Sequence, residues 1–164
     1  MAEHQAQAQA LNGVSANGVS DQPWYATYPK ASSEPAGISR QEVLQLLKSN
    51  TAPGENFVLI DLRRTDYEGG TITGSINLPA QSIFPTIPSL YSLFDAAGVK
   101  QVIWYCGSSR GRGNRAAAWF ADYLVEQHNT NMKSLVLLEG IKGWAAEKGE
   151  FVQYMQEYDD SRWQ

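Results

Sequence analysis

The sequence contains a single cysteine, Cys106, whose surroundings suit a nucleophile. The thiol follows the apolar run Val102 to Tyr105, and five mostly small residues separate it from Arg112. A loop of this kind can turn successive backbone N–H groups inward, and a helix that starts after it adds partial positive charge. The same field favours the thiolate over the thiol. We therefore expect Cys106 to attack the central atom of a tetrahedral oxyanion, and Arg112 to hold two of its oxygens with a planar guanidinium.

The residues around this pair are the candidates for binding the oxyanion. No Asp or Glu occurs between Gly107 and Gly111, so the loop offers no carboxylic acid as a general acid. The Ser109 hydroxyl could bond either the sulfur or the loop backbone. The side chains of Arg110 and Arg115 are expected to face solvent, with contact to the substrate as the alternative. The expected oxyanion-binding set is Gly107, Ser108, Ser109, Arg110, Gly111 and Gly113.

Three other motifs overlap the same loop and are disfavoured. The run Gly107 to Gly111 fits Gly-x-Ser-x-Gly, the nucleophile elbow of α/β-hydrolases, which requires a downstream histidine. His128 is the candidate, but it comes at the end of the next expected helix, away from the loop. A Cys-His protease is disfavoured for the same reason. The loop also lacks the Gly-Lys-Ser/Thr ending of a nucleotide-binding loop, which disfavours ATP hydrolysis.

Apolar runs and helical patterns alternate along most of the chain. The run Phe57 to Leu62 has no polar alternation, which is typical of a parallel strand covered on both faces. Ser39 and Glu42 form a capping box, which predicts that a helix starts there. Strands are expected at residues 57–62, 75–78, 102–105 and 134–138, and helices at 39–50, 83–97, 114–127, 143–148 and 150–158. This alternation predicts an α/β fold in one domain, with a mostly parallel central sheet flanked by helices.

Composition argues against several classes of function. The 164 residues contain 13 Lys and Arg against 17 Asp and Glu, so the net charge of −4 provides no basic field for nucleic acid or acidic lipid. One cysteine cannot form an internal disulfide, and with only His4 and His128 beside it no metal site is expected. The chain has no apolar run long enough for a membrane span and no signal-peptide pattern at its N-terminus. We expect a protein of the cytoplasm or the nucleus, with neither nucleic acid nor membrane as a partner.

The N-terminal part differs in composition from the rest of the chain. Residues 1–22 are rich in Ala, Gln, Asn, Gly and Ser without amphipathic periodicity, and are expected to form a disordered tail. Trp24, Tyr25 and Tyr28 cluster between two prolines, so residues 23–37 are expected to pack on the domain as an extension. The folded domain is expected over residues 38–164.

Two separated motifs match a known family in their order and residue types. Cys106, Ser109, Arg112 and Gly113 fit the pattern His-Cys-x-x-Ser-x-x-Arg-Gly-Pro. An upstream block comprises residues 60–63, 66–70 and 74–79, with the sequences IDLR, DYEGG and GSINLP. Together these motifs resemble the rhodanese-fold superfamily, in its branch of cell-division-cycle-type dual-specificity phosphatases and eukaryotic, fungal-type arsenate reductases. The resemblance covers residues 38–158 and implies a rhodanese-like catalytic domain.

The resemblance implies a structural role for Asp61 and Arg63 at the end of a strand. Two positions depart from the family pattern, because Tyr105 stands in place of the histidine and Asn114 in place of the proline. The loop before Arg112 is longer than the Cys-x4-Arg loops of sulfurtransferases. This length favours phosphate or arsenate as the substrate.

Four functions stay open on this resemblance. The favoured one is a phosphatase of phosphotyrosine, phosphoserine or phosphothreonine that forms a phosphocysteine on Cys106. The alternative is an arsenate reductase, and because the chain has no second cysteine its reductant would be glutathione or a glutaredoxin. A rhodanese sulfurtransferase and a non-catalytic rhodanese-like binding module are further alternatives. The implied partner is a phosphorylated protein or a small oxyanion, no cofactor is implied beyond that reductant, and a homodimer stays open.

Overall fold

Strands and helices alternate in the computed structural model, which describes residues 21–164. The tail expected over residues 1–22 falls, up to residue 20, outside the described residues. In chain order the elements are β1 (Ala36–Ile38), α1 (Arg40–Lys48), β2 (Phe57–Asp61), β3 (Thr71–Ile72), β4 (Ile76–Asn77), η1 (Ala80–Ser82), α2 (Ile83–Ala96), β5 (Gln101–Tyr105), α3 (Arg112–Glu126), β6 (Lys133–Leu137), α4 (Gly140–Ala146), α5 (Gly149–Gln153), β7 (Met155–Gln156) and η2 (Asp160–Arg162).

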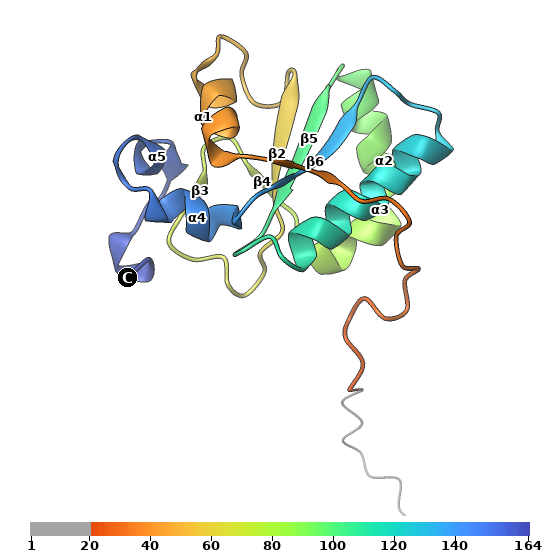
Figure 1. Cartoon of the computed structure of the whole chain (residues 1–164), viewed down its shortest axis with the longest axis horizontal. Helices are drawn as coiled ribbons and strands as arrows, with labels where there is room; N and C mark the ends of the chain where they lie inside the picture. Colours follow the sequence, from red (N-terminus) through yellow and green to blue (C-terminus); the bar gives the residue numbers. More distant parts are fainter. Residues whose placement is uncertain (1–20) are drawn as a thin grey trace, which may run out of the picture.

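Five strands form a central sheet in the order β1-β6-β5-β2-β4 (Figure 1). Every neighbouring pair in this sheet is parallel. The α/β fold with a mostly parallel sheet, expected from the sequence, is therefore confirmed. β5 lies in the middle of the sheet between β6 and β2, so the residues after its carboxyl end are flanked by the ends of two other strands.

Both faces of the sheet are covered, because successive side chains along a strand point to opposite sides. Ile60 and Trp104 lie in a buried cluster with side chains of α2 and α3. Leu59 and Ile103 lie in a second cluster with side chains of α1 and α4. Burial on both faces explains why the apolar runs of β2 and β5 show no polar alternation.

The start of α1 is as the sequence predicts. The Ser39 hydroxyl accepts from the N–H of Glu42 at 3.2 Å, and the Glu42 carboxylate accepts from the N–H of Ser39 at 2.9 Å. This reciprocal capping box satisfies two amides that a helix start would otherwise leave without partners.

Several short elements differ from the sequence expectations. β1 is not expected from its sequence Ala-Gly-Ile, yet it pairs in parallel with β6. The helix expected over residues 150–158 is wrong beyond Gln153, because the chain turns there and forms β7, which pairs antiparallel with β3. α3 starts at Arg112 rather than at residue 114, which places that side chain in the first turn of the helix.

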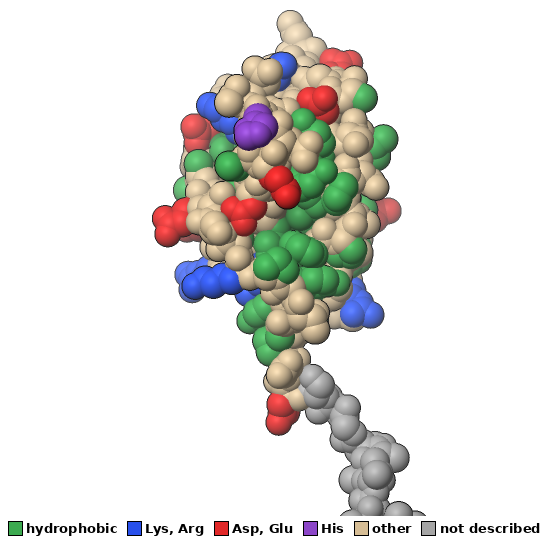
Figure 2. Space-filling model, turned by 90° about the vertical axis from the view of Figure 1, so that its right-hand side faces the viewer, with side chains coloured by type: hydrophobic (Ala, Val, Ile, Leu, Met, Phe, Trp, Pro, Cys, Tyr) green, Lys and Arg blue, Asp and Glu red, His purple; other side chains and the backbone are tan. Residues whose placement is uncertain are grey.

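The N-terminal residues pack along α3. The Trp119 ring meets those of Trp24 and Tyr28, with ring centroids 6.2 and 5.7 Å apart, and its indole N–H donates to the Pro29 carbonyl at 2.9 Å. A cavity of about 570 Å³ lies between this segment, α2 and α3. Figure 2 shows hydrophobic side chains gathered on the face that the N-terminal segment, α2 and α3 form. In residues 21–164, no helix has the length and apolar character that a membrane span requires.

Candidate active site

β5 carries Cys106 to the carboxyl end of the sheet, where ligands bind in open α/β folds. The cysteine is 3% exposed and belongs to the cluster that faces α2 and α3. The preceding residue, Tyr105, belongs to the cluster on the opposite face. The strand therefore presents the thiol on one side only, at the start of the loop that leads to α3.

The loop after Cys106 leaves a row of backbone amides without partners. Within the described part of the chain, the N–H groups of residues 107–111 donate no hydrogen bond. The carbonyls of Cys106 and Gly107 accept from the N–H groups of Ile141 and Lys142, at 3.0 and 2.9 Å. Because the N–H of a trans peptide points opposite to its C=O, the amides of these two peptide units point away from α4. Unpaired amides just before a helix start are suited to binding an anion.

Ser109 shapes this loop from inside. Its φ of 58° is in the left-handed region, the residue is 4% exposed, and its hydroxyl accepts from the N–H of Cys106 at 3.3 Å. The hydroxyl therefore bonds the loop backbone, which was one of the two alternatives for this residue. A Cβ atom built on Gly113 would lie 2.9 Å from the Cβ atom of Ser109. Only glycine at position 113 therefore lets the first turn of α3 pack against Ser109.

Gly140 lets α4 approach the loop from the other side. Its φ is 58°, and a Cβ atom there would lie 2.5 Å from the carbonyl oxygens of both Cys106 and Gly107. A side chain at this position is therefore excluded on two grounds, the backbone conformation and the space. The close approach also brings the N–H groups of α4 within reach of the two loop carbonyls.

The guanidinium of Arg112 is held by a carboxylate from another loop. Its Nη1 and Nη2 donate to Oδ1 and Oδ2 of Asp66, at 2.8 and 2.5 Å. These hydrogen bonds lower the pKa of Asp66 to about 2, so the carboxyl is ionised at neutral pH. The same contact raises the pKa of Arg112, and the nearby charge of Cys106 adds to the effect. Arg112 therefore lies beside the thiol, and one N–H donor from each of its two terminal nitrogens is taken by Asp66.

Asp61 and Arg63 form a buried pair under the loop that carries Asp66. Their exposures are 0% and 2%, and the shortest of their contacts, from Nη2 to Oδ2, is 2.7 Å. Arg63 also donates to the carbonyls of Glu68 at 2.9 Å and Gly70 at 2.7 Å. The pair therefore fixes the backbone of residues 64–70 from the inside.

Tyr105 stands at the position where the family pattern has histidine, and its phenol does not face the thiol. The phenol oxygen lies 2.8 Å from the Thr71 hydroxyl and 2.6 Å from that of Ser75, and it accepts from the N–H of Ile72 at 3.3 Å. Burial raises the pKa of this phenol, and the charge of Asp61 adds to the effect. The side chain joins β5 to the β3–β4 segment, and all of its hydrogen bonds within residues 21–164 are to that segment.

Lys142 is a further charged residue at this site, and no pattern in the sequence marks it. A Cβ atom built on Gly107 would lie 3.6 Å from Lys142 Cε, 3.9 Å from Arg112 Nη2 and 4.0 Å from Asp66 Oδ2. The three side chains therefore surround one point above Gly107. Two of the groups follow strands that neighbour β5, since Asp66 comes after β2 and Lys142 after β6.

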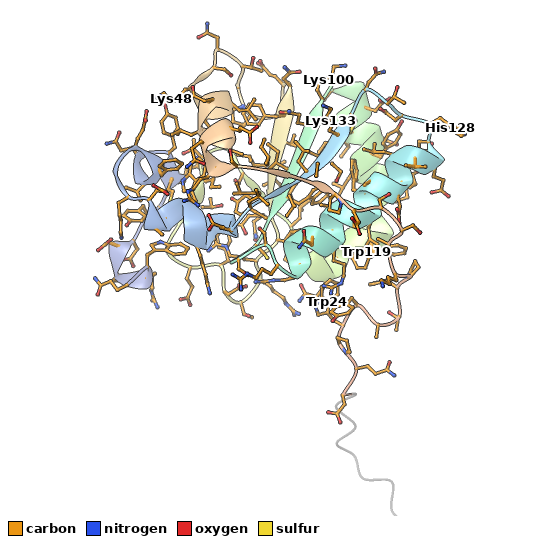
Figure 3. All side chains as sticks on the ribbon, in the orientation of Figure 1. Trp24, Lys48, Lys100, Trp119, His128 and Lys133 are labelled. Carbon is orange, nitrogen blue, oxygen red and sulfur yellow. The ribbon has the colours of Figure 1, made fainter. Side chains whose placement is uncertain are left out.

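Other residues considered from the sequence lie away from this point. Arg110 is exposed and borders a cavity of about 630 Å³ beside residues 30–35. The Arg115 guanidinium stacks on the Tyr25 ring, 3.3 Å from its centroid. His128 lies at the far end of α3 from the Cys106 loop (Figure 3), so it cannot serve as the base of a hydrolase elbow.

The two remaining residues of the expected oxyanion-binding set belong to the loop after Cys106. Gly111 precedes α3 as its N-cap, and Ser108 is half-buried in the loop.

Comparisons with known proteins show what this chain is similar to. Residues 39–147 match the rhodanese-like domain. The chain is 30% identical to Arsenical-resistance protein 2 of Saccharomyces cerevisiae, over 55% of this chain and 75% of that protein. An As-Sb reductase from Leishmania major has a similar structure, with a TM-score of 0.63, 24% identity and coverage of 71% and 80% of the two chains. Ygr203w, a yeast protein tyrosine phosphatase of the rhodanese family, has a TM-score of 0.64, 22% identity and coverage of 80% and 99%.

Proposed function

The chain belongs to the rhodanese-like domain family, and we propose from this premise that it is a cysteine enzyme that reduces arsenate with an external thiol. The observation that carries the proposal is the row of unpaired amides between Cys106 and Arg112, which suits a tetrahedral oxyanion. The relative at 30% identity is an arsenical-resistance protein, which supports arsenate as that oxyanion.

A missing proton donor favours arsenate over a phosphate ester. A phosphatase has to protonate the oxygen of the departing alcohol, and a carboxylic acid near the nucleophile commonly does so. Asp66 is the carboxyl that meets Arg112, and its pKa of about 2 leaves it without a proton at neutral pH. Arsenate carries hydroxyl groups of its own, and one of them leaves as water after taking a proton from solvent, so no alkoxide has to be protonated in its first step.

The proposed reaction uses Cys106 and two equivalents of an external thiol. The Cys106 thiolate attacks arsenic, the Sγ–As bond forms, the bond from arsenic to one hydroxyl breaks, and that hydroxyl leaves as water after taking a proton from solvent. A thiol from glutathione or a glutaredoxin then attacks Sγ, and the electron pair of the Sγ–As bond stays on arsenic, which becomes As(III). The second thiol reduces the resulting mixed disulfide and restores Cys106. The external thiol is required because the chain has one cysteine.

Arg112 and the loop amides stabilise the first step in this scheme. Negative charge builds on the equatorial oxygens as the thiolate attacks, and donors aimed at those oxygens lower the barrier. A guanidinium fork can hold two of them at once. A phosphatase is the second candidate, because the same donors suit phosphate as well as arsenate.

A comparison of three substrates tests the proposal. The purified chain is assayed for arsenate reduction with glutathione, glutaredoxin and an NADPH-coupled recycling system, and in parallel for hydrolysis of an aryl phosphate and for sulfur transfer from thiosulfate to cyanide. We expect arsenate-dependent NADPH oxidation that Cys106→Ser abolishes. Cysteine-dependent turnover of the aryl phosphate alone would replace this proposal with the phosphatase, and turnover of thiosulfate alone would replace it with sulfur transfer.

A further inference from the structure

The contact with Asp66 occupies one two-pronged set of donors on the Arg112 guanidinium, Nη1 and Nη2. Both terminal nitrogens of the guanidinium point at the two carboxylate oxygens, which is the geometry in which arginine holds two oxygens of phosphate or arsenate. An oxyanion that binds this same pair of nitrogens has to displace the carboxylate. Asp66 therefore competes with the substrate for the same two donors.

The pair is open to solvent, and this makes the displacement feasible. The Asp66 side chain is 46% exposed and that of Arg112 is 26% exposed. Exposed ion pairs contribute little net free energy, because water and salt screen them and two side chains have to be held in place. A dianion seated on the loop amides can therefore replace a single carboxylate.

The backbone beneath Asp66 is fixed, so its side chain is the part that has to move. Arg63 holds the carbonyls of Glu68 and Gly70 from the inside. From the outside, the Trp163 indole N–H donates to the Gly69 carbonyl at 2.8 Å, and Arg162 pairs with Glu68 at 3.2 Å. After displacement the carboxylate stays near the site and needs another partner.

Lys142 is placed to be that partner. Its Cε atom and the Asp66 carboxylate lie 3.6 and 4.0 Å from the same point above Gly107. The lysine side chain is exposed, and within residues 21–164 its ammonium forms no ion pair. A flexible cation that forms no ion pair within residues 21–164 thus lies next to the space that Asp66 borders.

We propose that Lys142 is a positioning residue of this site, which accepts the Asp66 carboxylate when an incoming oxyanion takes Arg112. The inference rests on the proposed role of Arg112 in oxyanion binding. The Asp66 carboxylate then moves from one cation to another. Its negative charge stays paired, so it does not repel the bound oxyanion. Lys142 supports binding through Asp66 and does not itself hold the anion.

Anion binding, measured without turnover, tests this exchange. Isothermal titration calorimetry with phosphate and with tungstate gives the dissociation constants for the full chain and for Asp66→Asn, Lys142→Met and the double variant. Asparagine keeps the carbonyl oxygen that accepts from the N–H of Arg64 at 3.2 Å, so the loop turn is preserved. Glu150→Gln and Lys148→Met are the matched controls, since each removes a charge of the same sign from an exposed ion pair between other segments of the fold.

We expect Asp66→Asn to tighten anion binding about fivefold, equivalent to about 1 kcal/mol, because the competing carboxylate is gone. Lys142→Met should weaken binding about threefold in the wild-type background and have no effect in the Asp66→Asn background. Lys142→Arg should restore the wild-type value, and both controls should leave it unchanged.

Two results would overturn the exchange. Equal weakening by Lys142→Met in both backgrounds would show that the lysine holds the anion directly. An unchanged affinity in Asp66→Asn would show that the carboxylate does not compete. Because the probes are not turned over, a failure to reduce arsenate leaves this test intact, whereas the absence of anion binding in every variant would remove the oxyanion site and the exchange together.

Discussion

Asp61→Asn should destabilise the fold strongly, because it leaves the Arg63 cation buried without its counter-ion. The two side chains are 0% and 2% exposed, and Arg63 donates to the carboxylate through Nε at 3.0 and 3.1 Å and through Nη2 at 2.7 Å. Removing one partner of a buried pair costs about 3 to 5 kcal/mol, whereas a whole domain is stable by about 5 to 15 kcal/mol. We therefore expect the free energy of unfolding to fall by about 3 to 5 kcal/mol.

Urea unfolding, followed by tryptophan fluorescence and far-ultraviolet circular dichroism, measures this loss. Glu68→Gln is the comparison, since it breaks a pair with Arg162 in the same region whose side chains are 57% and 55% exposed. That change should cost less than about 1 kcal/mol. If the two variants lose the same free energy to within about 1 kcal/mol, burial is not what makes the Asp61 pair structural, and the reasoning is refuted.

Three further outcomes are expected. Tyr105→Phe should lower the free energy of unfolding in urea by about 1 to 3 kcal/mol with anion affinity retained, because the lost phenol contacts lie on the face opposite Cys106. Gly140→Ala should weaken phosphate binding in calorimetry, unlike Gly149→Ala, where φ is also positive but no atom lies within 4 Å. Because the pKa of Asp66 is lowered in the folded state, its carboxylate stabilises the fold at pH values above its ordinary pKa of about 3.9, and this contribution is lost as the pH falls toward 2. In urea titrations across this pH range, Asp66→Asn should therefore lose less stability than the unaltered chain.

The strand, loop and helix around Cys106 could be predicted from the sequence because their signals are local. An apolar run that ends in Cys106, five mostly small residues and an arginine before a helical pattern together specify a strand, a tight loop and a helix start. The strand at residues 57–61 could be predicted for a similar reason, since a run of apolar residues without alternation fits only burial on both faces.

The shortest strands could not be predicted, because their stability comes from pairing and not from their own residues. β1 has three residues, of which only Ile38 has a buried apolar side chain, and the strand is held by its parallel pairing with β6. β3 and β7 have two residues each, and each is specified by the other across 82 or more intervening positions. No periodicity can be read from two residues.

The charged groups around Cys106 depend on the order of the strands, and this order is a property of the whole sheet. Asp66 and Lys142 are 76 residues apart in the sequence, and neither has a local pattern that marks it. They meet because β2 and β6 both neighbour β5, so the segments after these three strands converge at one edge. The same order puts a carboxylate on one side of the oxyanion loop and an ammonium on the other. In the proposed exchange, transfer of Asp66 to Lys142 leaves the net charge of these three side chains unchanged and frees the two Arg112 donors for the substrate.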